Sequence, residues 1–190
     1  MHRLRTDCPW DAEQTHLSLM TYLVEETAEV VEAVESGEDE LMVEEFGDLL
    51  LQIYFHAEIA TERQGFTLAD IARSIADKLI ARHPWVYGDQ NTPSNPWVSW
   101  EKSKRAEKQR RSAVDGIPDP LSGLARANKV VTRLRSHQVP IALDDTEITA
   151  AETGQAILAL VARAHASGID PEQAVRFAVR ELEDQVRATE

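Results

Sequence analysis

The stretch LMVEEFGDLLLQIYF at residues 41–55 decides the fold of this chain. Its second half is an almost unbroken apolar run, and apolar residues occupy nearly every side of a helix built from it. Such a segment predicts a buried helix. Asp48 interrupts the run, and a carboxylate near a buried segment costs several kcal/mol unless it is paired. The sequence therefore predicts that Asp48 has a partner.

The residues on both sides of this stretch also follow the period of an α-helix. Apolar residues recur at helical spacing from Met20 to Val34, and Gly37 ends the pattern. Thr67 and Asp70 form a capping box that opens another helix, which ends before Pro84. No segment alternates as a strand would, so the predicted fold is all-α. The expected helices cover 15–36, 40–63, 67–82, 97–112, 121–136, 148–166 and 171–188.

The charge of the chain limits its partners. The 190 residues are 43% hydrophobic and 28% charged, and the formal net charge is -13. This composition is typical of a globular protein, and the negative charge argues against nucleic acid or an anionic membrane as a partner. A phosphorylated small molecule is still compatible, because a bound cation can reverse the local field.

Cysteine content and apolar segments indicate the compartment. Cys8 is the single cysteine, so no internal disulfide is possible and a reducing, cytoplasmic location is expected. The first residues, MHRLRTDCPW, have no apolar core, and no window approaches roughly 18 apolar residues. We therefore expect neither a signal peptide nor a membrane span.

The chain resembles itself in two halves. Three segments of the first half align by hand with three of the second, although helical sequences are easily over-aligned. The prediction is a catalytic helical unit over 1–112 and a degenerate second repeat over 113–190, which packs on the first or on a partner subunit. The aligned segments are 65–82 with 168–185, 45–57 with 152–164, and, weakly, 24–31 with 124–131.

Acidic pairs on two predicted helices suggest a metal site. Glu26 and Glu29 share one helix face, and Glu45 and Asp48 share another, because each pair is spaced i,i+3. The short connection makes the two helices antiparallel neighbours. Four carboxylates facing one another would suit Mg2+ or Mn2+. The alternative for the acids from Glu25 onward is a solvated helix face.

The second half serves as an internal comparison, because it keeps the apolar pattern and loses most of the acids. This difference is expected if the acids serve chemistry rather than folding. Glu45 alone keeps an acidic counterpart, Glu152. Glu25, Glu26 and Glu29 are replaced by Ala125, Arg126 and Lys129, and Asp48 is replaced by Gln155.

Cations follow the acids along the sequence. Lys78 and Arg82 are spaced i,i+4, and so are Trp100 and Lys104, which would offer an aromatic face and an ammonium to one ligand. Surface lysines and arginines covering apolar residues, and a core tryptophan beside a solvated lysine, are the alternatives. The basic run 102–111 is interpreted as a solvated helix face.

Five segments together resemble the MazG family of nucleoside triphosphate pyrophosphohydrolases. The resemblance covers most of 8–112, and the segment GIPDPLSGLARANKV (116–130) continues it. The acidic motifs alone are moderately specific, whereas five segments in order are strongly so. They are CPWDAEQTHLSL (8–19), EETAE (25–29), EFGD (45–48), KLIARHPWVYGD (78–89) and WEKSK (100–104).

This resemblance implies an all-α bundle of the NTP pyrophosphohydrolase type that converts a nucleoside triphosphate to the monophosphate and pyrophosphate. It implies housecleaning of non-canonical nucleotides, Mg2+ as the cofactor, one working site per chain, and a homodimer or higher oligomer. The implied metal residues are Glu26, Glu29, Glu45 and Asp48 with Glu25 beside them. The implied phosphate and ligand contacts are Lys78, Arg82, Lys104 and Trp100.

Two questions of mechanism stay open in the sequence. Glu25 either polarises the attacking water or binds the metal, while Lys78, Arg82 and Lys104 would offset charge on the departing pyrophosphate. The competing hypothesis is a non-catalytic helical module whose acids bind a cation or a basic partner. In the second half, Glu181 and Gln185 stand at the positions aligned with Lys78 and Arg82. This joint loss of acids and cations favours the enzyme.

Overall fold

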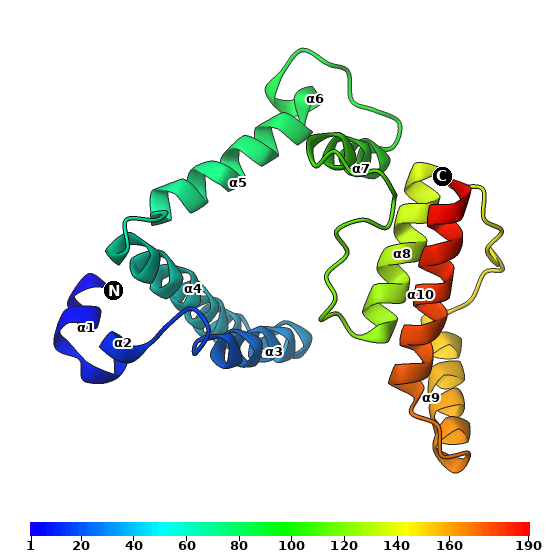
Figure 1. Cartoon of the computed structure of the whole chain (residues 1–190), viewed down its shortest axis with the longest axis horizontal. Helices are drawn as coiled ribbons and strands as arrows, with labels where there is room; N and C mark the ends of the chain where they lie inside the picture. The colour runs from blue at the N-terminus through cyan, green and yellow to red at the C-terminus, as the bar shows by residue number, and fades with distance from the viewer. The chain divides into compact units, whose positions relative to one another are not determined.

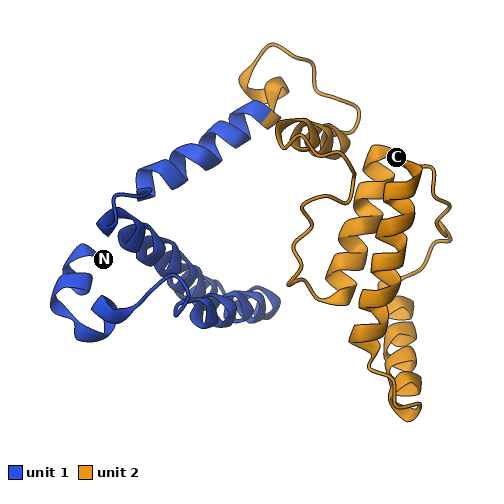
Figure 2. Cartoon of the chain, viewed as in Figure 1, with its two compact units in different colours: residues 1–81 blue, residues 82–190 orange.

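The computed structural model describes residues 1–190 and contains helices and no strands, which confirms the all-α prediction. The chain divides into two compact units, Met1–Ala81 and Arg82–Glu190 (Figure 2). Each unit is described by itself below. The predicted division after residue 112 is based on the sequence similarity between the two halves rather than on contacts within each unit, and it stays a prediction.

Unit 1 is organised around two long helices. α3 (Met20–Ser36) and α4 (Asp39–Glu62) lie side by side as an antiparallel pair (Figure 1). Gly37 ends α3 with a positive φ of 73°, a conformation that glycine adopts without strain. The other helices that begin in this unit are α1 (His2–Asp7), α2 (Pro9–Glu13) and α5 (Leu68–Arg82).

The helix starts show where local chemistry confirmed the sequence prediction and where it did not. α5 begins as predicted, because the Thr67 hydroxyl accepts from the Asp70 backbone N–H at 3.3 Å and the Asp70 carboxylate accepts from that of Thr67 at 2.9 Å. The helix expected from residue 15 begins only at Met20. Thr15 and Ser18 each accept the other's backbone N–H instead, at 3.1 and 2.9 Å, and these bonds compete with a helical turn.

Burial along α4 differs from the sequence prediction. A small core forms where Leu19, Phe55 and Ile59 meet. Asp48 is exposed, and so are Leu50 and Tyr54 in the same apolar run. The prediction that Asp48 lies in the most buried segment was wrong, because α3 covers one side of α4 and the rest of this helix segment remains open to solvent in the single chain.

Unit 2 has a larger core. α8 (Gly123–His137) packs along α10 (Pro171–Thr189), with α7 (Pro96–Glu107) against α8 and α9 (Ala150–Ala166) against α10. α6 (Pro84–Tyr87) is a single turn. The buried core residues come from the linker after α7 and from the helix pair: Ala113, Val114, Ile117, Val130, Leu134, Val179 and Val186.

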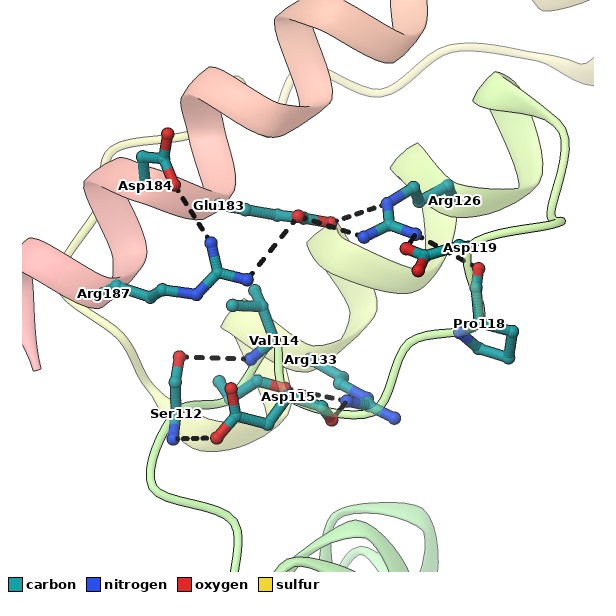
Figure 3. Close-up of polar contacts among 11 residues, drawn as sticks. Ser112, Val114, Asp115, Pro118, Asp119, Arg126, Arg133, Glu183, Asp184 and Arg187 are labelled. Carbon is teal, nitrogen blue, oxygen red and sulfur yellow. Dashed lines mark hydrogen bonds and ion pairs between the residues drawn. The ribbon is translucent and has the colours of Figure 1, made fainter.

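Two buried charged side chains of unit 2, Glu183 and Arg133, are held by specific hydrogen-bond partners. The Arg126 guanidinium bonds both oxygens of the buried Glu183 carboxylate, at 2.8 and 3.1 Å (Figure 3). Arg133 donates to the backbone carbonyls of Ala113 and Asp115, at 3.0 and 2.6 Å. The bonds of Arg133 hold the linker against α8.

None of the helices in the chain combines the length and apolar character needed to cross a bilayer.

Candidate functional site

Three acidic side chains meet where α3 and α4 pack together. Glu26 and Glu29 lie one turn apart on α3, and Glu45 lies on the facing part of α4. Each carboxylate offers one oxygen, and these oxygens lie within 4.8 Å of one another. The i,i+3 spacing and the antiparallel packing that the sequence predicted are what bring them together.

The electrostatics of this cluster favour a cation. Partial burial, and then the charges of Asp48 and Glu29, raise the pKa of Glu26 above its ordinary value. Burial, followed by the charge of Glu29 and other acids, also raises the pKa of Glu45. Carboxylates that repel one another at this range are hard oxygen donors of the kind that bind Mg2+ or Mn2+. The residues therefore fit a divalent ion.

The other two predicted metal residues lie outside the three-residue cluster. Asp48 is exposed on α4, one turn after Glu45, and its charge adds to the rise in the pKa of both Glu26 and Glu45. Glu25 is exposed on α3, next to Glu26 in sequence but about 100° away around the helix. Three of the five predicted residues are thus close enough to share an ion in this structure.

Gln52 is a neighbour of the cluster that the sequence reasoning missed. It is buried on α4, and its side-chain nitrogen lies 3.5 Å from a Glu26 oxygen. Its amide oxygen has no hydrogen-bond partner. The signal was present, because Gln52 is a polar residue in the apolar run, spaced i,i+4 from Asp48. Its amide can hold the Glu26 carboxylate in place.

The predicted cations are divided between the two units. Lys78 is half-buried on α5, in unit 1. Arg82 belongs to unit 2, where it is buried and donates to one Glu107 oxygen through Nε and Nη2, at 2.9 and 2.6 Å. This bond lowers the pKa of Glu107. The Arg82 guanidinium also lies 5.0 Å from the centre of the Trp100 ring. In this arrangement Arg82 orders Trp100 and Glu107.

The segment WEKSK (100–104) lies in the middle of α7. Trp100 packs against His83 at 4.9 Å between ring centres. Burial lowers the pKa of Lys104, and the charge of Glu101 opposes that change. Glu101, which the sequence reasoning passed over, is buried between α7 and α8. No pattern in the sequence distinguishes it from the exposed acids of the chain.

Aromatic and histidine side chains gather at the other end of α4. Trp10 meets Tyr22 and Phe55 edge-on, at 5.8 and 6.3 Å between ring centres. His16 and His56 stack, with their Nδ1 atoms 2.8 Å apart. Burial, and then the charge of His16, lower the pKa of His56. These contacts join the N-terminal helices to α4 and fix the helix that carries Glu45.

Comparison with known proteins identifies the family of the chain. The family model of the MazG nucleotide pyrophosphohydrolase domain matches residues 14–87, which include all five predicted metal residues. The nucleoside triphosphate pyrophosphohydrolase/pyrophosphatase MazG of Thermotoga maritima is 34% identical over 215 residues, covering 100% of this chain and 82% of that protein.

Two other relatives are longer than this chain. The nucleoside triphosphate pyrophosphohydrolase of Mycobacterium tuberculosis is 37% identical over 193 residues, covering 100% of this chain and 56% of its own length. That of Escherichia coli K12 is 41% identical over 141 residues, covering 70% of this chain and 54% of its own length. The chain belongs to the MazG family of nucleoside triphosphate pyrophosphohydrolases.

Proposed function

We propose that this member of the MazG family hydrolyses a nucleoside triphosphate to the monophosphate and pyrophosphate, with Mg2+ held by Glu26, Glu29 and Glu45. The convergence of these three carboxylates between α3 and α4 carries the proposal. The acids of an ordinary solvated helix face would point into solvent, away from those of other helices. Here Glu26 and Glu29 of α3 converge with Glu45 of α4. The names of the Thermotoga, Mycobacterium and Escherichia relatives support the same reaction.

The residues of the cluster would act by holding and orienting. When bound, Mg2+ supplies Lewis acidity that lowers the pKa of a coordinated water and orients the triphosphate. Glu26, Glu29 and Glu45 would fix the position of the ion, and Gln52 would keep Glu26 turned toward it. Asp48, exposed one turn from Glu45, would complete the oxygen set when substrate is present. Glu25 would either polarise the water or serve as a further ligand.

The phosphate chain would be bound by cations. Lys78 and Lys104 are the predicted contacts that are not bonded to an acid at hydrogen-bond distance, so they would offset charge on the departing pyrophosphate. Arg82 is already bonded to Glu107, and its proposed part is therefore to hold Trp100 as well as to reach a phosphate. Trp100 would stack on the ligand.

The proposed biological role is housecleaning of non-canonical nucleotides in a reducing, cytoplasmic compartment. The single cysteine, Cys8, is a free thiol, in keeping with that compartment. A panel of normal and damaged ribonucleoside and deoxyribonucleoside triphosphates would test the role. Preferred turnover of damaged nucleotides is expected, and equal turnover of normal and damaged nucleotides would contradict it.

The proposed reaction is tested with two matched substitutions on α3. Glu26→Gln removes one charge of the cluster while keeping the side-chain volume, and pyrophosphate release with Mg2+ should fall by about 100-fold or more. Glu35→Gln changes an exposed acid of the same helix outside the cluster and should leave turnover within about twofold. Equal activity of the two variants would refute the metal assignment.

We also propose that the chain forms a homodimer or higher oligomer through the α3–α4 pair. Large apolar side chains are exposed along both helices, among them Val24, Val43, Phe46 and Leu50. Exposed large apolar side chains at helical spacing, as Val43, Phe46 and Leu50 are, are typical of an interface between proteins. Light scattering after gel filtration should give a mass above that of one chain, and Phe46→Glu should lower it. A monomeric wild-type chain would contradict this proposal.

A further inference from the structure

The Glu101 carboxylate is the least satisfied acid in unit 2. Its side chain is only 1% exposed, and neither carboxylate oxygen has a hydrogen-bond partner. A buried carboxylate is costly unless opposite charges or hydrogen bonds compensate it. The cations around Glu101 therefore explain why it is tolerated.

Two ammonium groups face this carboxylate from two different helices. Lys104 Nζ on α7 lies 3.8 Å from Glu101 Oε1, and Lys129 Nζ on α8 lies 3.9 Å from the same oxygen. Both distances are too long for a hydrogen bond. Lys104 and Lys129 keep 24% and 31% of their side chains exposed. Each ammonium can therefore reach a ligand while Glu101 remains covered.

Positive charge exceeds negative charge at this point. Arg133 on α8 is also buried, and its Nη1 is committed to the carbonyls of Ala113 and Asp115 (Figure 3), while its Nε has no partner. Burial, then the charges of Lys129, Arg133 and Arg110, lower the pKa of Lys104 against the opposing effect of Glu101. One carboxylate thus faces several cations in a chain whose net charge is -13. Such a surplus attracts an anion.

We propose that Lys129 and Lys104 together bind phosphate groups of the substrate or of the pyrophosphate product, and that Glu101 is the positioning residue that holds both ammonium groups. The proposal rests on the proposed function and adds a phosphate contact from α8. Lys129 stands where the hand alignment of the two halves places Glu29. In this proposal the second half contributes a positive charge, Lys129, at the position aligned with a negative charge in the first half.

The position of the two lysines suits a polyphosphate. An ammonium is a compact charge with three donors, and two of them at the rim of one buried carboxylate can contact neighbouring phosphate oxygens. Hydrogen bonds between charged groups are the stronger kind. Glu101 lies too deep to reach the solvent-facing ligand itself, so its effect on the anion passes through the lysines.

Binding of inorganic pyrophosphate to the full 190-residue chain tests the role of Lys129. Calorimetry in Mg2+ buffer should show that Lys129→Gln weakens binding by about tenfold or more. Lys102→Gln, an exposed lysine of α7 on another side of the helix, is the matched control and should stay within about twofold. Equal affinities for the two variants, or no pyrophosphate binding by the wild type, would overturn the proposal.

Glu101→Gln separates positioning from a purely structural role. Removing this charge lowers the pKa of Lys104 further, and a lysine loses its charge as the pH rises through its pKa. Pyrophosphate affinity of the variant should therefore fall more steeply between about pH 7 and 9 than that of the wild type. Circular dichroism should show unchanged helix content. An unaltered pH profile would overturn the role of Glu101.

The two proposals fail in different ways. If the wild-type chain releases no pyrophosphate from any triphosphate, the proposed reaction is wrong, while the binding experiment still decides whether Lys129 contacts the anion. If turnover is normal and Lys129→Gln leaves both the KM and the pyrophosphate affinity unchanged, the reaction stands and this inference fails.

Discussion

The two units use charge in opposite ways. In unit 2 the buried acid Glu183 is bonded by Arg126, and the buried Arg133 is bonded to backbone carbonyls. In unit 1 three acids converge, and mutual repulsion contributes to the raised pKa values of Glu26 and Glu45. The first arrangement stabilises a fold by itself. The acidic cluster of unit 1 has no cation of the chain to neutralise it, which is typical of a site that binds a metal ion.

The apolar cores of the two units also differ, and that of unit 2 is larger. Unit 2 buries a continuous apolar cluster between α8, α10 and the linker. Unit 1 has a small cluster around Leu19, Phe55 and Ile59, and much of the apolar surface of α3 and α4 remains exposed. Unit 2 therefore contains more of its stabilising contacts within one chain, whereas unit 1 depends more on a ligand or a second copy.

The largest expected effect concerns the buried ion pair of unit 2. Arg126→Ala leaves the Glu183 carboxylate buried with only a more distant arginine, and the free energy of unfolding should fall by about 3–5 kcal/mol. Denaturant unfolding measures the change. Arg73→Ala, which breaks an exposed pair with Asp70 in unit 1, is the matched control and should change little.

Replacing Arg126 and Glu183 together tests whether the lost stability comes from the uncompensated charge of Glu183. Replacing both residues by apolar ones, Arg126→Met with Glu183→Leu, should restore most of the lost stability, because no charge is left buried. If the double variant is no more stable than Arg126→Ala, packing rather than charge explains the loss.

The next effect compares one acid in each half of the chain. Glu45→Gln should reduce pyrophosphate release by about 100-fold or more, because it removes a proposed metal ligand. Glu152→Gln changes the aligned acid of α9, whose carboxylate closes a capping box with Thr149 that glutamine can also close. Steady-state kinetics should show near-normal turnover for Glu152→Gln. Similar losses in both variants would remove the distinction between the halves.

A smaller effect is the dependence of unit 1 on pH and Mg2+. The raised pKa values of Glu26 and Glu45 mean that ionising these groups destabilises the folded chain. This destabilisation is absent below their ordinary pKa and complete above the raised pKa, so without a cation stability falls as pH rises through that window. At pH 7.5, Mg2+ at about ten times its Kd should raise Tm by roughly 3–6 °C.

Thermal unfolding at two pH values checks the sign. The Mg2+ effect should shrink at about pH 4.5, where protons compete for the carboxylates, and Glu26→Gln should reduce it at both values. An equal Mg2+ effect in the wild type and in Glu26→Gln would show that the ion binds elsewhere.

The smallest effect should be the same in both units. Thr67→Ala and Thr149→Ala each remove the N-cap side chain of a capping box, at the start of α5 and of α9. Each should cost about 1 kcal/mol of unfolding free energy, because capping is a local interaction that does not depend on the rest of the unit. Chemical denaturation would measure both, and a large difference would show that one helix start has a further tertiary role.

Much of the fold was predictable because it is encoded locally. The i,i+3 and i,i+4 spacings gave α3, α4 and α5, and Thr67 with Asp70 gave the start of α5. The acidic pairs followed from the same spacing, and Glu26, Glu29 and Glu45 do meet. The short helices α1, α2 and α6 were missed, since segments of four to six residues carry too little periodicity to recognise.

The rest of the site could not be predicted for a physical reason. The exposure of Asp48 depends on which side of α4 its neighbours cover, and an apolar run on all sides does not specify that. Arg82 bonds Glu107, 25 residues away, and Lys129 meets Glu101 across two helices. Contacts between residues this far apart in the chain produce no regular spacing from which they could be predicted.

The sequence by itself determined the long helices, the family and which acids share a helix face, because all three depend on residue order over short distances. The tertiary structure alone decided which charges are already neutralised within the chain and which still face a ligand. Coulomb interactions act through space, and their strength depends on burial that only packing creates. Glutamate therefore forms an ion pair with Arg126 in unit 2, whereas three glutamates form an unneutralised acidic cluster in unit 1.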